Sequence, residues 1–186
     1  MPRSTTRTTE KTRNMVYIAL FAVLMAVCAW ISVPAAVPFT MQTFAVFLAV
    51  GVLGGRKGTI AVVVYILMGA VGMPVFSHFQ GGLGVLFQAT GGYILGFLLT
   101  ALIMWGMETL SNGKPWVTIT SMVLGLLACY AFGTIWFVIL YTRNTGTIGP
   151  GAALLWCVAP YIIPDLAKMA LALTLTRRLR TALKLQ

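Results

Sequence analysis

Acidic and imidazole side chains are almost absent from this sequence. Its 186 residues include one histidine, His78, and three acidic residues, Glu10, Glu108 and Asp165. Metal sites and intramembrane acid–base catalysis need several such groups together, and these four are widely spread along the chain. We therefore expect no catalytic residues, no metal site and no resident cofactor. A binding or transport role is favoured over an intramembrane enzyme.

A phosphate-binding loop is also missing. The glycine-rich stretch GVLGGRKGT, at residues 51–59, lacks the glycine-lysine-serine/threonine order that cradles nucleotide phosphates. Any ATP hydrolysis linked to this chain must therefore be carried out by another protein.

Cysteine and charged residues are scarce as well. The three cysteines are spread out in apolar runs, so they are expected to be small buried side chains and not a disulfide framework (Cys28, Cys129 and Cys157). Charged residues make up only 9% of the chain, whereas hydrophobic residues make up 59% and the mean hydropathy is +0.93. This composition predicts an all-α integral membrane protein without a sizeable soluble domain.

Long apolar runs are what the sequence does contain. There are six, separated by segments rich in glycine, proline and small polar residues: 15–33, 41–54, 59–75, 92–110, 116–141 and 153–176. A membrane-crossing helix needs about 20 apolar residues. The first run is too long for a signal peptide, so we interpret it as a retained helix. We predict one transmembrane domain over residues 1–186, with six transmembrane helices.

The basic residues indicate the orientation of these helices. The formal net charge is +10, yet the bases form no patch interleaved with aromatic residues, so no nucleic-acid partner is expected. Eleven of the thirteen bases fall on one side of a strictly alternating topology: Arg3, Arg7, Lys11, Arg13, Arg56, Lys57, Lys114, Arg177, Arg178, Arg180 and Lys184. The positive-inside rule makes that side cytoplasmic. We expect a multi-pass protein of the cell membrane with a basic N-terminus (1–14) and a basic C-terminal tail (177–186), both inside.

Two ionisable residues, Asp165 and Lys168, lie inside the last apolar run. Each charge at a helix centre costs about 2.5 to 3.5 kcal/mol, so the two require a partner, a cavity or a function. Three residues apart, they share one helix face. Because Pro160 and Pro164 break or kink the segment, we expect Asp165 in the first turn of a helix that begins near the outer face. The alternative is an ion pair that satisfies itself and only orients the helix.

The connectors on the outer side carry uncharged polar groups next to glycine and aromatic residues. Such groups suit the recognition of a small molecule that arrives from outside. The candidates are Thr40 and Gln42 in the first connector, and His78, Gln88, Thr90, Gly91 and Tyr93 in and after the second. The second connector could instead be no more than a flexible extracellular loop.

A stripe of alanines marks one face of the first helix. Its members are Ala19, Ala22, Ala26 and Ala29, and the spacing of Ala22 and Ala26 allows another helix to approach closely. That helix could belong to this chain or to a second membrane protein.

Taken together, these features resemble the biotin-specific substrate-binding subunits (S components, BioY family) of energy-coupling factor (ECF) transporters. The specific parts are the block GMPVF…GG…TGGYILGF within residues 72–97 and PDLAK at 164–168. The resemblance implies an S-component fold whose connectors 1–2 and 3–4 close as lids over biotin. It also implies a membrane coupling subunit, which Ala22 and Ala26 would face, and two ATPase subunits.

The resemblance places the outer-connector candidates in the two lids, and Asp165 and Lys168 in the pocket. Asp165 suits the ureido N–H donors of biotin, and Lys168 suits either the ureido oxygen or the carboxylate. The alternatives are an S component for another vitamin and a small-molecule transporter that works without ATPase subunits.

Overall fold

The computed structural model describes residues 3–35, 37–110 and 115–183. The elements, in chain order, are α1 (Arg3–Trp30), β1 (Ser32–Val33), β2 (Phe39–Thr40), α2 (Gln42–Leu53), α3 (Gly55–Ala70), η1 (Ser77–Phe79), α4 (Leu83–Leu86), α5 (Gly91–Leu110), α6 (Pro115–Asn144), α7 (Pro150–Cys157), η2 (Ala159–Tyr161) and α8 (Ile162–Leu183). The predicted all-α class is confirmed, apart from the two-residue strands β1 and β2.

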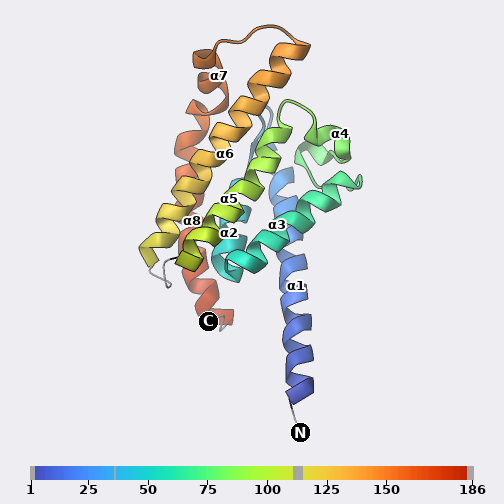
Figure 1. Cartoon of the computed structure of the whole chain (residues 1–186), viewed down its shortest axis with the longest axis vertical. Helices are drawn as coiled ribbons and strands as arrows, with labels where there is room; N and C mark the ends of the chain where they lie inside the picture. The colour runs from blue at the N-terminus through green and yellow to red at the C-terminus, as the bar shows by residue number, and fades with distance from the viewer. Residues whose placement is uncertain (1–2, 36, 111–114, 184–186) are drawn as a thin grey trace.

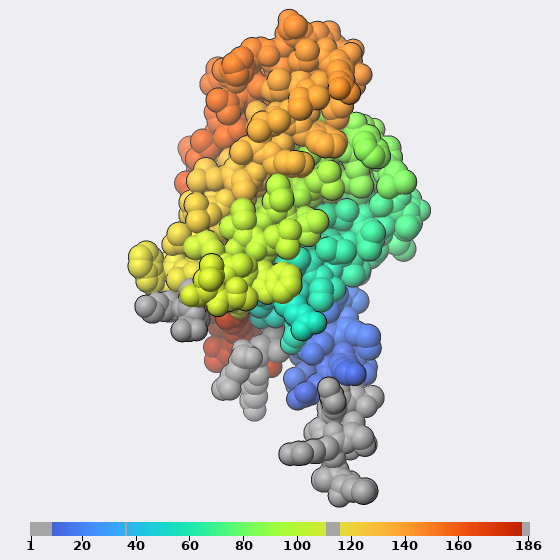
Figure 2. Space-filling model, in the orientation of Figure 1, coloured from blue at the N-terminus to red at the C-terminus, as the bar shows by residue number. Residues whose placement is uncertain are grey.

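The helices run up and down a single bundle (Figure 1). The start of α1, the end of α8 and the start of α6 lie at its lower end, whereas the end of α6 and α7 lie at its upper end. Helices α3, α5 and α6 lie side by side on the face seen in Figure 2, and the part of α1 drawn in blue extends below them.

Helix α2 is the centre of the bundle. All but one of its 12 residues are buried, and it packs against α1, α3, α5 and α8. A helix that is hydrophobic on every side can lie in lipid or inside a protein, and here the four neighbouring helices enclose it. The first residues of α2, Gln42 and Thr43, are therefore carried into the interior of the protein.

Not every predicted run is long enough to cross a bilayer alone. In the described part of the chain, four segments have the length and composition of a membrane span: Thr9–Trp30, Gly91–Leu110, Trp116–Asn144 and Pro150–Leu183. At a rise of about 1.5 Å per residue, α2 is only about 18 Å long and α3 about 24 Å, against a hydrocarbon core of about 30 Å.

The connection between the second and third helices, expected at residues 54–58, is much shorter in the structure than the sequence predicts. Only Gly54 interrupts the helices, with φ of 80°, a conformation that favours glycine. Helix α3 begins at the next residue, so Arg56 and Lys57 lie in its first turn and not in a loop. Because a single residue joins them, α2 and α3 form a tight helical hairpin.

The last apolar run is broken where its prolines predict. Helix α7 ends at Cys157, the short η2 contains Pro160, and α8 begins at Ile162. Pro164 lies in the first turn of α8, where a missing N–H costs no helical hydrogen bond. Helix α8 continues to Leu183, so the described part of the predicted C-terminal tail is helical.

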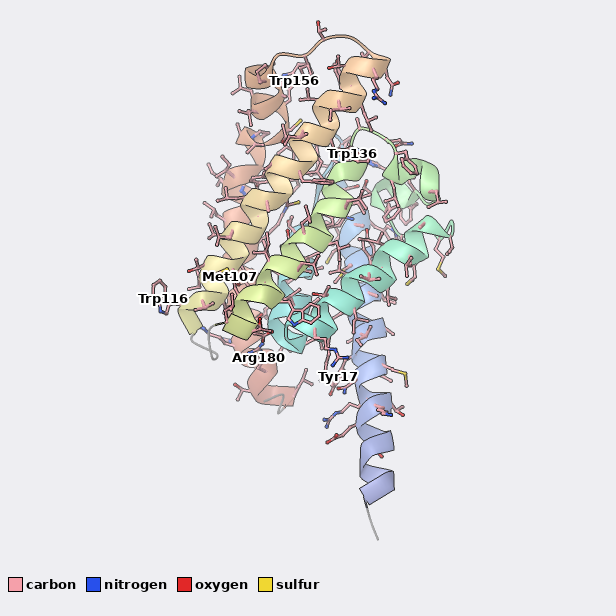
Figure 3. The ribbon with its side chains drawn as sticks, in the orientation of Figure 1. Tyr17, Met107, Trp116, Trp136, Trp156 and Arg180 are labelled. Carbon is pink, nitrogen blue, oxygen red and sulfur yellow. The ribbon has the colours of Figure 1, made fainter. Side chains whose placement is uncertain are left out.

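Glu108, at the end of α5, ties four helices together at the lower end of the bundle. Its carboxylate accepts the backbone N–H of Gly55 and lies 3.4 Å from Nη2 of Arg180. Arg180, labelled in Figure 3, also donates from Nε to the carbonyl of Gly51 at 2.6 Å. The ends of α2, α3, α5 and α8 thus meet around one carboxylate.

The structure decides between the two interpretations of the alanine stripe. Ala22 and Ala26 are 0% and 3% exposed and belong to the core of this chain, where α1 packs on α2 and α3, while Ala19 is exposed. The prediction that Ala22 and Ala26 face a coupling subunit is therefore corrected. Their small side chains let α1 approach its own neighbours closely.

Candidate binding site

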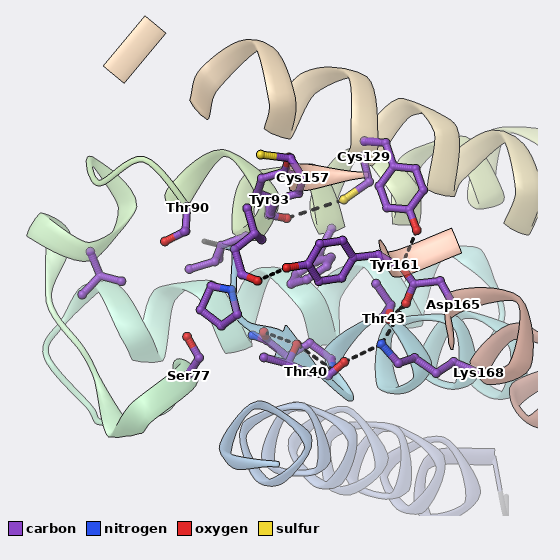
Figure 4. Close-up of a pocket in the computed structure, with 17 residues that line it drawn as sticks. Thr40, Thr43, Ser77, Thr90, Tyr93, Cys129, Cys157, Tyr161, Asp165 and Lys168 are labelled. Carbon is purple, nitrogen blue, oxygen red and sulfur yellow. Dashed lines mark hydrogen bonds and ion pairs between the residues drawn. The ribbon is translucent and has the colours of Figure 1, made fainter. Parts of the chain in front are cut away.

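A pocket lies between the β1–β2 hairpin and the ends of several helices (Figure 4). Its walls come from the hairpin, α2, η1, α4, α5, α6, α7, η2 and α8, and its empty volume to the mouth is about 650 Å³. One end of the pocket holds Asp165 and Lys168, and the other holds Ser77 and Thr90.

Asp165 and Lys168 form an ion pair at the inner end of this pocket. Nζ of Lys168 lies 2.8 Å from Oδ1 of Asp165, and the residues are 3% and 5% exposed. Asp165 occupies the first turn of α8, as predicted, where the helix dipole favours a negative charge. The pair satisfies itself electrostatically, but it does so inside a cavity.

Two hydroxyl groups from other helices also donate to Asp165. Thr43 on α2 donates to Oδ1 at 2.9 Å, and Tyr130 on α6 donates to Oδ2 at 2.5 Å. A buried carboxylate is costly unless its lone pairs are filled with good geometry. Three donors from α2, α6 and α8 therefore fix both oxygens of Asp165 in position.

Lys168 joins α8 to the hairpin. Besides Asp165, its Nζ donates to the carbonyl of Thr40 at 2.6 Å and lies 4.0 Å from the ring centroid of Phe39. A cation over an aromatic face contributes about 2 kcal/mol when desolvated. The position of β2 thus depends on the charge of Lys168.

Tyr161 of η2 holds the same hairpin from a second point. Its hydroxyl donates to the carbonyl of Val37, and its ring stacks on Phe39 at 6.3 Å. The hairpin itself is short, with Ser32 paired to Thr40 and Val33 to Phe39. Contacts from η2 and α8, more than its own two-residue strands, hold it against the pocket.

The structure brings together six of the nine predicted site residues. The pocket is lined by Thr40, Gln42, Thr90, Tyr93, Asp165 and Lys168. They arrive from the hairpin, from the start of α2, from the start of α5 and its preceding turn, and from the first turns of α8.

The other three predicted residues do not line the pocket. His78 is exposed in η1, with φ of 57°. Gln88 is exposed too, and its carbonyl accepts the indole N–H of Trp136 at 3.1 Å. Gly91 begins α5 so close to the backbone of Leu86 that a Cβ would overlap it. Gly91 therefore shapes the turn into α5.

Sequence reasoning missed several lining residues. Among them are Thr43, Ser77, Tyr130 and Tyr161, together with Cys129 and Cys157. The cysteines are buried, as expected, and Sγ of Cys129 lies 3.7 Å from the carbonyl of Tyr93. Thr43 and Ser77 carried a usable signal, since each is next to a predicted site residue in the sequence.

The arrangement suits a ligand with polar groups at both ends and an apolar middle. Asp165 offers a fixed acceptor and Lys168 a cationic donor, while hydroxyls of Ser77 and Thr90 lie at the far end. Between them, Val85, Ile94 and Phe97 form apolar walls. Such a site can bind and orient a small molecule.

Comparison with known proteins identifies a family. The BioY family matches residues 2–185. The biotin transporter BioY of Thermotoga maritima is 37% identical over 171 residues, which cover 90% of this chain and 96% of that protein. The probable biotin transporter BioY of Pyrococcus horikoshii is 36% identical, over 91% and 98% of the two chains.

A solved structure shares the fold. The crystal structure of an S-component for biotin from an ECF-type ABC transporter matches with a TM-score of 0.81, over 93% of each chain and at 22% identity. With the family matched over almost the entire length and two relatives above 30% identity, this chain belongs to the BioY family.

Proposed function

We propose that this protein is a membrane subunit that binds biotin for uptake. The observation that carries the proposal is the Asp165–Lys168 pair, which is buried within the helical bundle and lines a pocket with both polar and apolar walls. Relatives covering about nine-tenths of the chain are named biotin transporters, and the S-component for biotin has the same fold. A charged pair retained at this cost inside a membrane protein indicates a binding function.

Biotin has the groups that the pocket can serve. Its ureido ring carries two N–H donors and a carbonyl, its fused rings are apolar, and its side chain ends in a carboxylate. Asp165 accepts from the N–H groups, and Lys168 donates to a ligand oxygen. Thr40, Thr90 and Tyr93 lie along the same cavity and complete the proposed contacts.

We also propose the topology that the sequence predicts. The chain would form one transmembrane domain with six membrane-inserted segments, α1, α2, α3, α5, α6 and α7–α8, and with both ends in the cytoplasm. Exposed tryptophans support this placement, because Trp116 lies at the lower end of the bundle and Trp156 at the upper end (Figure 3). Tryptophan is enriched at both membrane interfaces.

The β1–β2 hairpin and the segment 71–90, which includes η1 and α4, would be the two lids over biotin. The partners would be a membrane coupling subunit and two ATPase subunits of an ECF module. The likeness to the S-component supports this assignment.

Equilibrium binding of biotin to the purified protein in detergent or nanodiscs tests the proposed function. We expect tight binding of biotin, with thiamine and riboflavin as controls that do not compete. Mass spectrometry of the denatured protein identifies any ligand that was retained. Absence of biotin binding, or retention of a different vitamin, would overturn the assignment.

A further inference from the structure

A line of buried hydrogen bonds connects the β1–β2 hairpin to the segment 71–80, which follows α3. The hydroxyl of Thr40 donates to Oε1 of Gln42 at 2.8 Å. Nε2 of Gln42 donates to the hydroxyl of Tyr65 at 2.5 Å, and that hydroxyl donates to the carbonyl of Val75 at 3.2 Å. The line passes from β2 through α2 and α3 to the second connector, and all four residues are buried.

Both polar groups of the Gln42 side chain already have hydrogen-bond partners within the protein. Its side-chain oxygen accepts from Thr40, its side-chain nitrogen donates to Tyr65, and its backbone N–H lies 3.3 Å from Oγ1 of Thr40. A buried amide that loses such partners keeps the full cost of desolvation. The geometry therefore favours retention of these bonds when the pocket is filled.

Tyr65 holds the second connector by its ring as well as by its hydroxyl. Phe76 is completely buried and packs edge-on against the Tyr65 ring, with centroids 5.7 Å apart. Phe76 also lies directly over Gly69, where a Cβ would overlap its ring, and its N–H donates to the carbonyl of Gln80 at 3.0 Å. The segment 71–80 is thus fastened to α3 around one tyrosine.

A second link joins the same two regions closer to the surface. Trp30, which ends α1 just before the hairpin, donates from Nε1 to the carbonyl of Pro74 at 2.9 Å. Its ring stacks on Phe79 at 5.0 Å. The hairpin and the segment 71–80 are therefore joined on two sides, one buried and one exposed.

We propose that Gln42 and Tyr65 are positioning residues that make the β1–β2 hairpin and the segment 71–80 move as one unit. The proposal rests on the function proposed above, in which these two regions cover the ligand. Lys168 already donates to the carbonyl of Thr40, at the hairpin end of the line. A ligand that engages Lys168 would therefore order both the hairpin and the segment 71–80. The segment 71–80 would respond through the hydrogen bonds of Gln42 and Tyr65.

Hydrogen–deuterium exchange of the full-length protein in nanodiscs tests this link without any ligand. We expect Tyr65→Phe, which keeps the ring, to speed exchange about fivefold in peptides of both the hairpin and the segment 71–80. Gln42→Leu should speed exchange in the hairpin and in 71–80 in the same way. Because the bonds act in series, the double variant should exchange no faster than the faster single variant.

Thr59→Val is the matched control. Thr59 is also buried on α3, and its hydroxyl donates to the carbonyl of Gly55 at 2.7 Å and contacts that of Ala101 at 3.3 Å, away from both covers. Thr59→Val should leave exchange in the hairpin and in 71–80 unchanged.

Three results would overturn the proposal. They are faster exchange in only one of the two regions, an additive increase in exchange in the double variant, and an equal increase in Thr59→Val. If Tyr65→Phe does not fold, Gln42→Leu with the same control gives the answer. Biotin binding is measured separately, so its absence would refute the function and leave the exchange result standing.

Discussion

The hydroxyl of Tyr130 on α6 donates to Oδ2 of Asp165 on α8 at 2.5 Å, across the inner end of the pocket. Thr43 and Lys168 occupy Oδ1 of the same carboxylate. Each oxygen of Asp165 therefore has a partner on a different structural element. The acceptor directions left for a ligand are set by these contacts and not by the rotamer of Asp165 alone.

Tyr130→Phe should weaken biotin binding about tenfold, because a hydrogen bond to a charged group contributes about 1.5–3 kcal/mol and orients the carboxylate. Calorimetric titration measures the change. Tyr141→Phe is the matched control, since Tyr141 lies on the same helix, stacks on Phe137 and does not line the pocket. Equal affinities for the two variants would show that Tyr130 does not orient Asp165.

The Asp165–Lys168 pair gives a prediction about stability as well as binding. Asp165→Asn leaves a buried ammonium group without its counter-ion, so we expect a loss of about 3 kcal/mol or more in unfolding free energy. The double variant Asp165→Asn with Lys168→Met should be more stable than Asp165→Asn alone, yet neither should bind biotin tightly. Thermal unfolding and equilibrium binding measure the two effects. A double variant less stable than the single one would contradict this account of the pair.

Glu108 provides the contrast to Asp165. Glu108→Gln weakens the contacts to the Gly55 N–H and to Arg180, at sites that are partly exposed. We expect a loss of about 1 kcal/mol, which corresponds to a fall of about 2–4 °C in Tm, with biotin affinity unchanged. A large loss of affinity in this variant would mean that the lower end of the bundle communicates with the pocket.

Two glycines make a matched pair for testing how tightly the Phe76 ring packs against α3. A Cβ at Gly69 would overlap the Phe76 ring, so Gly69→Ala should cost about 1–3 kcal/mol by overpacking. Gly106, inside α5, has open space around its Cβ position, so Gly106→Ala should stabilise the helix by about 0.5–1 kcal/mol. Thermal unfolding measures the Tm of both variants. Similar changes in Tm would show that the Phe76 ring moves aside without cost.

Much of the fold could be predicted from apolar runs and breakers. A membrane helix must satisfy its own backbone, so long apolar runs map onto helices with little ambiguity. The ends are harder, because Gly54 alone separates α2 from α3, and Arg56 and Lys57 look like loop residues although they begin a helix. Hydropathy cannot distinguish a loop from a first helical turn at the membrane surface.

The charged pair of the site was predictable, whereas most of its supporting residues were not. Asp165 and Lys168 stand out because charges inside an apolar run are costly. Tyr130 and Tyr161 become site residues only because α6 and η2 lie close to the first turns of α8, and no local pattern encodes that arrangement. For the same reason the alanine stripe could not reveal that Ala22 and Ala26 contact this chain's own helices.

The central position of α2 determines which part of the pocket is sheltered from lipid. Thinning or thickening of the lipid acts on helices that touch it, and α2 is enclosed by α1, α3, α5 and α8. Gln42 and Thr43 sit at the start of this sheltered helix, beside the hairpin and Asp165. The part of the pocket that α2 supplies, including the Thr43 hydroxyl that donates to Asp165, is thus sheltered from direct contact with the lipid.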